Sequence, residues 1–173
     1  MADGFQISCI QHPETGRERT YGKRSKATAP RRVLVAGGGP AGMKAAAVAA
    51  ERGHDVTLFE SSGHLGGQVL VAQLLPGRSE FGGIVANLER EMTRSGVDIR
   101  LGTEVNMVLI ERGQPDAVIV ATGAQPAPPV LDGMDEAHIV EAWRGDMYVA
   151  GDCLSPRTVE EAVLEGLKAG VAV

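Results

Sequence analysis

Three glycines and a glutamate form the pattern in this sequence that is best suited to chemistry. Gly37, Gly39 and Gly42 have the spacing G-x-G-x-x-G, and Glu60 follows eighteen residues after the third glycine. In such a pattern the first glycine permits a tight turn, the second lets backbone amides approach a pyrophosphate, and the third lets a helix lie close to a sheet. A carboxylate at residue 60 can accept hydrogen bonds from a ribose 2′,3′-diol and repels a 2′-phosphate. The pattern therefore favours the adenosine end of FAD, NAD or ADP over that of NADP.

The segments around these residues have the order that a phosphate-binding turn requires. Residues 33–36 are a short apolar run typical of a strand buried on both faces, and a helix-forming run over 41–52 follows the glycines. A second strand over 55–59 ends directly before Glu60. Phosphates would lie at the helix N-terminus, where free N–H groups and the positive end of the dipole favour an anion. A glycine-rich turn without a ligand is the alternative interpretation.

The loop that begins at Ser61 adds further candidate residues. Its adjacent glycines, Gly66 and Gly67, indicate a backbone that passes close to a ligand, the alternative being a flexible surface loop. Arg78, which precedes the next predicted helix, is placed either to reach a phosphate or to remain a surface arginine.

Two later segments follow predicted strands as well. They are Ala121-Thr122-Gly123 and Gly151-Asp152. Because ligands of open parallel sheets bind beyond the carboxyl ends of the strands, we expect both segments at the same edge as the glycine turn. There Asp152 could accept hydrogen bonds from a polyol such as ribitol.

The whole chain predicts an α/β fold, a Rossmann-like three-layer parallel sheet with a small additional β segment. We expect a basic arm over residues 1–30 and one nucleotide-binding domain over 31–173. Further strands are expected over residues 97–101, 105–110, 116–120 and 147–150, with a helix capped by Ser79 that runs to Ser95 and a closing helix from Thr158 through Lys168.

Composition narrows the class of protein. The chain has 173 residues, 3% aromatic residues and a net charge of −5, which disfavours a nucleic-acid-binding protein. No apolar run approaches the length of a membrane span, and no secretory signal is visible at the N-terminus, so we expect a cytoplasmic protein. The two cysteines, Cys9 and Cys153, form no C-x-x-C pair, and a dithiol redox centre is not expected.

Taken together, these motifs resemble the FAD domain of the glutathione-reductase-like flavoproteins. The sequences around Cys9–Glu18, Ala50–Glu60 and Gly151–Thr158 further resemble the C-terminal half of the bacterial dienoyl-CoA reductase, trimethylamine dehydrogenase and N-methylproline demethylase group. The resemblance implies FAD or ADP as the ligand. It implies nucleotide contacts through residues of the glycine turn and its loops: Gly37, Gly39, Pro40, Ala41, Gly42, Glu60, Ser61, Gly66, Gly67, Gln68, Arg78, Val105, Ala121, Thr122, Gly123, Gly151 and Asp152.

The chain also departs from that group. The group's flavin-bearing barrel has no counterpart here, and Cys9 matches one of four iron–sulfur ligands whose other three are missing. A second nucleotide domain, which the group carries between Gly123 and Gly151, is replaced by 27 residues, with an apparent deletion near 130–147. Because three of the four iron–sulfur ligands are missing, no metal site is expected.

Two functions follow from this reading. In the first, the chain is the FAD domain of a flavin-dependent oxidoreductase, an electron-transfer module whose partner is a flavin/iron–sulfur barrel domain or a redox protein. In the second, it is a non-redox module that holds ADP and docks on a dehydrogenase. No catalytic set of side chains is visible, and NADPH-driven turnover by the chain alone is not expected.

Overall fold

Five parallel strands form the sheet at the centre of the fold. The computed structural model describes residues 8–124, 146–149 and 159–173. The strands are β1 (Arg32–Ala36), β2 (Asp55–Phe59), β3 (Asp98–Arg100), β4 (Ala117–Val120) and β5 (Asp146–Val149), and their order across the sheet is β3-β2-β1-β4-β5. Every neighbouring pair is parallel. This arrangement confirms the predicted Rossmann-like α/β fold.

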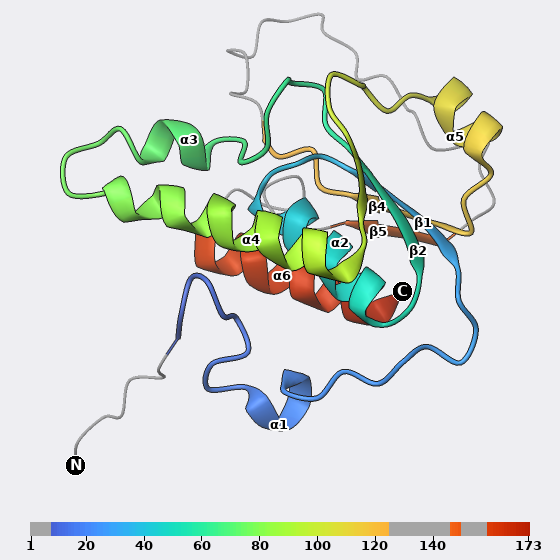
Figure 1. Cartoon of the computed structure of the whole chain (residues 1–173), viewed down its shortest axis with the longest axis horizontal. Helices are drawn as coiled ribbons and strands as arrows, with labels where there is room; N and C mark the ends of the chain where they lie inside the picture. Colours follow the sequence, from blue (N-terminus) through green and yellow to red (C-terminus); the bar gives the residue numbers. More distant parts are fainter. Residues whose placement is uncertain (1–7, 125–145, 150–158) are drawn as a thin grey trace, which may run out of the picture.

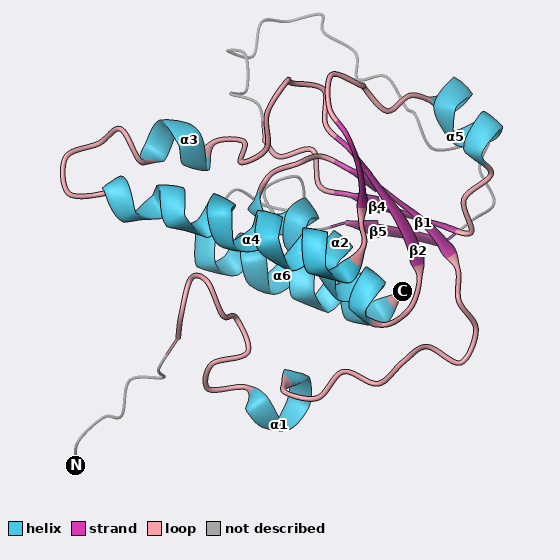
Figure 2. Cartoon of the chain, in the orientation of Figure 1, coloured by secondary structure: helices cyan, strands magenta, loops and turns pink. Residues whose placement is uncertain are grey.

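Three helices cover one face of the sheet (Figure 2). They are α2 (Pro40–Glu51), α4 (Gly82–Ser95) and α6 (Val159–Ala172). The alternation along β1 sends Val33 and Val35 into the core beneath these helices, whereas Leu34 and Ala36 face the opposite side. There the short helix α5 (Met107–Gly113) packs through Leu109 and Ile110. The two remaining helices, α1 (Glu18–Tyr21) and α3 (Val69–Ala72), are single turns.

Helix α2 is buried because its sequence is almost entirely small and apolar. Residues 41–50 are all buried, and α6 packs directly on this surface. The two helices approach each other closely at Gly166, where an added Cβ would lie only 2.1 Å from the carbonyl oxygen of Ala41. Glycine at that position therefore sets the distance between α6 and the first turn of α2.

Two of the predicted elements differ in the structure. The prediction of a strand over 105–110 is wrong, because the Asn106 side chain accepts a hydrogen bond from the Leu109 amide at 2.9 Å and caps α5. Ser79 does not cap α4 either, since it begins a 3₁₀ turn (Ser79–Phe81) that precedes the α-helix. The apolar face of α4 and its end at Gly96 are confirmed, with Ile84, Val85, Leu88 and Met92 buried.

The last predicted elements lie at the limits of the described residues. The strand predicted over 147–150 corresponds to β5, and the closing helix continues to Ala172 rather than ending at Lys168. The cap predicted at Thr158 lies outside the described residues. Among the helices of the described part of the chain, none is long and apolar enough to cross a membrane.

The basic N-terminal segment contacts the domain through α2. Pro13 is fully buried, and the amide of Ala27 donates to the carbonyl of Arg52 at 2.8 Å. Arg24 pairs with both Glu14 and Glu51, so one guanidinium joins the segment to α2.

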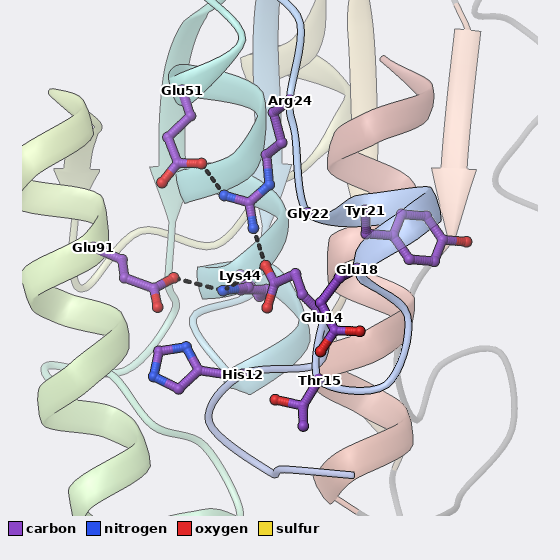
Figure 3. Close-up of a pocket in the computed structure, with 10 residues that line it drawn as sticks. All are labelled: His12, Glu14, Thr15, Glu18, Tyr21, Gly22, Arg24, Lys44, Glu51 and Glu91. Atoms are coloured by element: carbon purple, nitrogen blue, oxygen red, sulfur yellow. Dashed lines mark hydrogen bonds and ion pairs between the residues drawn. The ribbon is translucent and has the colours of Figure 1, made fainter. Parts of the chain in front are cut away.

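A cavity of about 530 Å³ lies where this segment meets α2 and α4 (Figure 3). The ammonium group of Lys44 is buried beside it, 2.8 Å from Glu91 and 3.5 Å from Glu14. The carboxylates of Glu14, Glu51 and Glu91 are thus each paired with a cation. The cavity is bordered by an internal ion-pair network that ties the segment to the domain.

Candidate nucleotide-binding site

The strand order places a crevice at the carboxyl end of β1. The chain leaves β1 toward β2 on one side, and β4 lies on the other side, so the direction of the winding changes between β1 and β4. In open α/β sheets ligands bind at this switch point. Gly37, directly after β1, and Ala121, directly after β4, meet here.

The three glycines of the fingerprint have three different surroundings. Gly37 has a φ of +111°, and a Cβ on it would lie 2.2 Å from the carbonyl oxygen of Ala121. A Cβ on Gly42 would lie 2.0 Å from the carbonyl oxygen of Gly37, whereas a Cβ on Gly39 would meet nothing within 4 Å. Gly37 and Gly42 are therefore required by the protein's own backbone, whereas Gly39 faces space that no residue of the described ranges fills. This is the arrangement in which a ligand can approach the backbone at the second glycine.

The N-terminus of α2 offers unpaired donors to this open space. Gly39 is the N-cap and Pro40 the first helical residue, and no side chain caps the helix. The first intrahelical bond runs from the Met43 amide to the Gly39 carbonyl, which leaves the amides of Ala41 and Gly42 without a backbone acceptor. No acidic side chain of the first turn occupies the positive end of the dipole, and a diphosphate fits there.

Glu60 points toward the glycine turn. Its Oε2 accepts a hydrogen bond from the Gly38 amide at 2.6 Å, and its Oε1 accepts one from the Ser62 amide at 2.8 Å. Partial burial raises the pKa of Glu60, but the donations from Ser62 and Gly38 together lower it more, so this pKa lies below its ordinary value. The Ser61 hydroxyl donates to Oε1 as well, at 3.3 Å, so the group is a fixed carboxylate with about one of its four lone-pair sites left for a ribose hydroxyl.

The loop from Glu60 to Gln68 runs along the crevice. The Gly66 amide donates to the Gly38 carbonyl at 2.8 Å, and a Cβ on Gly67 would lie 3.3 Å from the Cα of Gly39. At the end of the loop the Gln68 side chain donates to the carbonyl of Ala124 at 2.9 Å. The loop therefore passes from the carboxylate, past the open face of Gly39, to the segment that follows β4.

The residues after β4 divide into two roles. Ala121 is buried with its side chain against the position of Gly42, so it closes the turn. Thr122 is exposed, and a Cβ on Gly123 would meet no atom of the described residues within 4 Å. Gly151 and Asp152 lie outside the described residues.

The structure describes all of the predicted site residues except Gly151 and Asp152, and it brings most of these together. The glycine turn, Glu60, Ser61, the double-glycine loop and the end of β4 are adjacent. Arg78 stands apart from them, because its guanidinium lies over the Phe81 ring at 5.5 Å from the centroid. Val105 packs against the sheet face formed by Leu34, Ala36 and Val118. The predicted phosphate contact of Arg78 and adenine contact of Val105 remain predictions.

Two residues that sequence reasoning did not select contribute to the site. Gly38 provides the amide that holds Glu60. The Leu65 side chain occupies the space in front of Gly38, so that a Cβ on Gly38 would come within 2.7 Å of it. The only sequence signal for Gly38 is its place within a run of three glycines.

The sequence that forms this site matches that of a known protein family. The sequence pattern of the pyridine nucleotide-disulphide oxidoreductase family matches residues 31–146, which include the glycine turn, Glu60 and β4. The chain belongs to this family, and its nucleotide-binding domain is of the FAD-binding kind found in flavin-dependent oxidoreductases.

Three relatives are similar to this chain over most of its length. The NADH oxidase of Thermoanaerobacter brockii is 39% identical over 141 residues, which are 80% of this chain and 22% of that protein. The N,N-dimethylglycine/sarcosine dehydrogenase of Chromohalobacter salexigens is 45% identical over 128 residues, or 71% of this chain and 18% of that protein. The structure of histamine dehydrogenase from Rhizobium sp. 4-9 superposes with a TM-score of 0.65 at 30% identity, covering 77% of this chain and 21% of that one. The chain thus spans about a fifth of the length of these relatives.

Proposed function

We propose that this chain is the FAD-binding electron-transfer domain of an oxidoreductase in the dienoyl-CoA reductase, trimethylamine dehydrogenase and N-methylproline demethylase group. The observation that carries the proposal is the open face of Gly39, bordered by the free amides of α2 and by the fixed carboxylate of Glu60. Similarity to an NADH oxidase and to two amine dehydrogenases supports a redox role over a purely structural one.

Different residues of the site would contact different parts of FAD. The amides of Ala41 and Gly42 would hold the diphosphate at the helix N-terminus. Glu60 would accept from a hydroxyl of the adenosine ribose, and its charge would exclude a 2′-phosphate. The flavin end would lie beyond Gly123, where a Cβ would meet no atom of the described residues within 4 Å. When bound, FAD supplies the redox chemistry, and the protein's part is to hold and orient it.

The electrons must come from or go to another redox group. The part of the chain that the structure describes contains no group of three or more His, Cys, Asp or Glu that could hold a metal ion. Cys9 is a half-buried free thiol. A flavin/iron–sulfur barrel domain or a separate redox protein would serve as the partner, and the chain alone is expected to show no steady-state oxidation of NADPH.

Identification of the bound nucleotide tests this proposal. The purified protein is expected to be yellow with flavin absorbance, and denaturation should release FAD in about equimolar amount, identified by mass. A colourless protein that releases ADP would contradict the proposal and support the non-redox binding module. Sustained NADPH oxidation by the pure protein would contradict the need for a partner.

A further inference from the structure

Helix α6 lies against α2 (Figure 1), and two of its glycines contact the backbone of that helix. A Cβ on Gly166 would lie 2.1 Å from the carbonyl oxygen of Ala41, and a Cβ on Gly170 would lie 2.6 Å from that of Ala45. The hydrogen that each glycine carries in place of a Cβ therefore faces a carbonyl group of α2. Because both residue numbers increase together, the two helices run in the same direction and make the same kind of contact about one turn apart.

The first of these contacts reaches a group that would hold the diphosphate. The carbonyl of Ala41 and the N–H of Gly42 belong to one peptide unit, which is planar and moves as a rigid body. This N–H is one of the donors at the N-terminus of α2 that have no backbone acceptor. The carbonyl of Ala45, by contrast, shares its peptide unit with the N–H of Ala46, which lies inside the helix and is used in the helical hydrogen bonds.

The peptide between residues 41 and 42 is confined on its other side by the turn after β1. A Cβ on Gly42 would lie 2.0 Å from the Gly37 carbonyl oxygen and 3.3 Å from the Ala121 side chain. At the far end of the interface the Arg52 guanidinium donates to the carbonyl of Val171, which ties the end of α6 to the end of α2. The first turn of α2 therefore lies between α6 and the strand ends with little room to move.

We propose that Gly166 is a positioning residue for the diphosphate. By letting α6 touch the Ala41 carbonyl, it fixes the direction of the Gly42 N–H. This inference rests on the proposed function, because it takes the N-terminus of α2 as the diphosphate site. A methyl group on Gly166 would displace this peptide, and a hydrogen bond weakens steeply when its donor is misaligned. Ligand affinity should therefore fall even in protein that remains folded.

Gly166→Ala and Gly170→Ala form a matched pair that tests the proposal. Each adds one methyl group to α6 close to a carbonyl of α2, and the methyl group on Gly170 would also lie 2.8 Å from the Cβ of Val48. Both substitutions should therefore lower the melting temperature of the apo-protein. If Gly166 had only a structural role, the loss of ligand affinity would follow the loss of melting temperature in both variants.

ADP is the probe, because it carries the ribose and the diphosphate without the flavin. Calorimetric titration uses the full chain after removal of bound nucleotide, at a temperature where circular dichroism shows the variants to be folded. ADP affinity should fall about tenfold in Gly166→Ala, as expected when one hydrogen bond to a charged group is weakened. Gly170→Ala should retain ADP affinity to within about twofold, because the N–H that it displaces lies inside the helix.

A measurement on the wild type keeps the proposal testable if Gly166→Ala does not fold. In nitrogen-15-labelled protein, ADP should shift the amide resonance of Gly166 more than that of Gly170. The reason is that only Gly166 contacts the peptide that would bind the diphosphate.

Either of two results would overturn the positioning role. They are similar ADP affinities in Gly166→Ala and Gly170→Ala, and a shift at Gly166 no larger than that at Gly170. If the wild type binds ADP but not FAD, the flavin function fails while the comparison of the two variants still decides the role of Gly166. If the wild type binds FAD and Gly166→Ala binds ADP like the wild type, only the positioning role fails. A wild type that binds neither nucleotide would overturn both proposals.

Discussion

The Glu60 carboxylate accepts a hydrogen bond from the Gly38 amide at 2.6 Å, and this bond joins the end of β2 to the turn after β1. The acid that we propose binds the ribose is thereby fixed relative to the helix N-terminus that would hold the diphosphate. A ligand that contacts both groups finds them already in place, so little conformational freedom is lost at these two points on binding.

Replacing Glu60 by Gln tests this relationship. The amide oxygen can still accept from Gly38, but the charge and part of the acceptor capacity are lost, so FAD affinity should fall about tenfold. Titration of the apo-protein with FAD, followed by flavin fluorescence, measures the change. Glu104→Gln, an exposed glutamate, provides the control, and equal affinities for Glu60→Gln and wild type would refute the assigned role.

The same substitution tests a contribution to acid stability. The pKa of Glu60 is lower in the folded protein than the ordinary glutamate value of 4.5. Its contribution to stability is therefore present above pH 4.5 and is lost as the pH falls through the lower folded value. Glu60→Gln should remove this part of the acid destabilisation measured by urea unfolding between about pH 3 and pH 6.

Adding a methyl group at Gly42 should affect folding and not only binding. Because its Cβ would lie 2.0 Å from the Gly37 carbonyl oxygen, Gly42→Ala should lower the free energy of unfolding by about 2 kcal/mol or more. Gly39→Ala, whose Cβ meets nothing within 4 Å, should lower it by less than about 1 kcal/mol. Urea denaturation of the apo-proteins distinguishes the two, and equal losses would show that the surroundings of these glycines are misassigned.

His54 should make stability dependent on pH. It is 6% exposed, its Nδ1 accepts from the Arg31 amide at 3.1 Å, and its Nε2 has no hydrogen-bond partner within the described part of the chain. Burial lowers its pKa below 6.5, and the neighbouring Arg52 and Arg31 lower it further.

The unfolded chain therefore binds the His54 proton first as the pH falls, so stability present above pH 6.5 is lost on acidification through the folded pKa. His54→Asn keeps a side-chain acceptor for the Arg31 amide and removes the titration, so unfolding free energies should vary less between about pH 5 and pH 7. An unchanged pH profile would count against this assignment.

Lys44 should control how firmly the N-terminal segment is held. Lys44→Met removes the cation that joins Glu91 to Glu14 and should cost about 2 kcal/mol, less than a fully buried pair because both carboxylates are partly exposed. Trypsin should cleave faster near Lys23 and Arg24 in this variant, whereas Lys168→Met, at an exposed position of α6, should behave like the wild type. Unchanged cleavage would indicate that other contacts hold the segment.

The sequence was sufficient to predict the centre of the fold and the backbone geometry of the glycine turn. The roles of Gly37, Gly39 and Gly42 depend on local backbone geometry, which the spacing of the fingerprint encodes. The apolar face of α4 was equally readable, because Ile84, Val85, Leu88 and Met92 recur at helical spacing.

Other features depend on contacts that a linear sequence does not contain. The apolar run over 105–110 suits a strand as well as a short helix. The helix forms because the Asn106 side chain caps its N-terminus. The ion pairs of Lys44 and Arg24 join segments that are far apart in the chain. The closeness of α6 to the first turn of α2 rests on Gly166, which nothing in the sequence distinguishes from the other glycines.

FAD binding by Gly39→Val tests the central claim most directly. The added side chain would enter the open space at the N-terminus of α2 without meeting the protein's own atoms at its Cβ. Fluorescence titration should therefore show FAD affinity reduced by about a hundredfold or more, with a melting temperature of the apo-protein near that of the wild type. Gly113→Val, at the end of α5, should leave the affinity unchanged. Wild-type affinity in Gly39→Val would contradict the placement of the diphosphate at this turn.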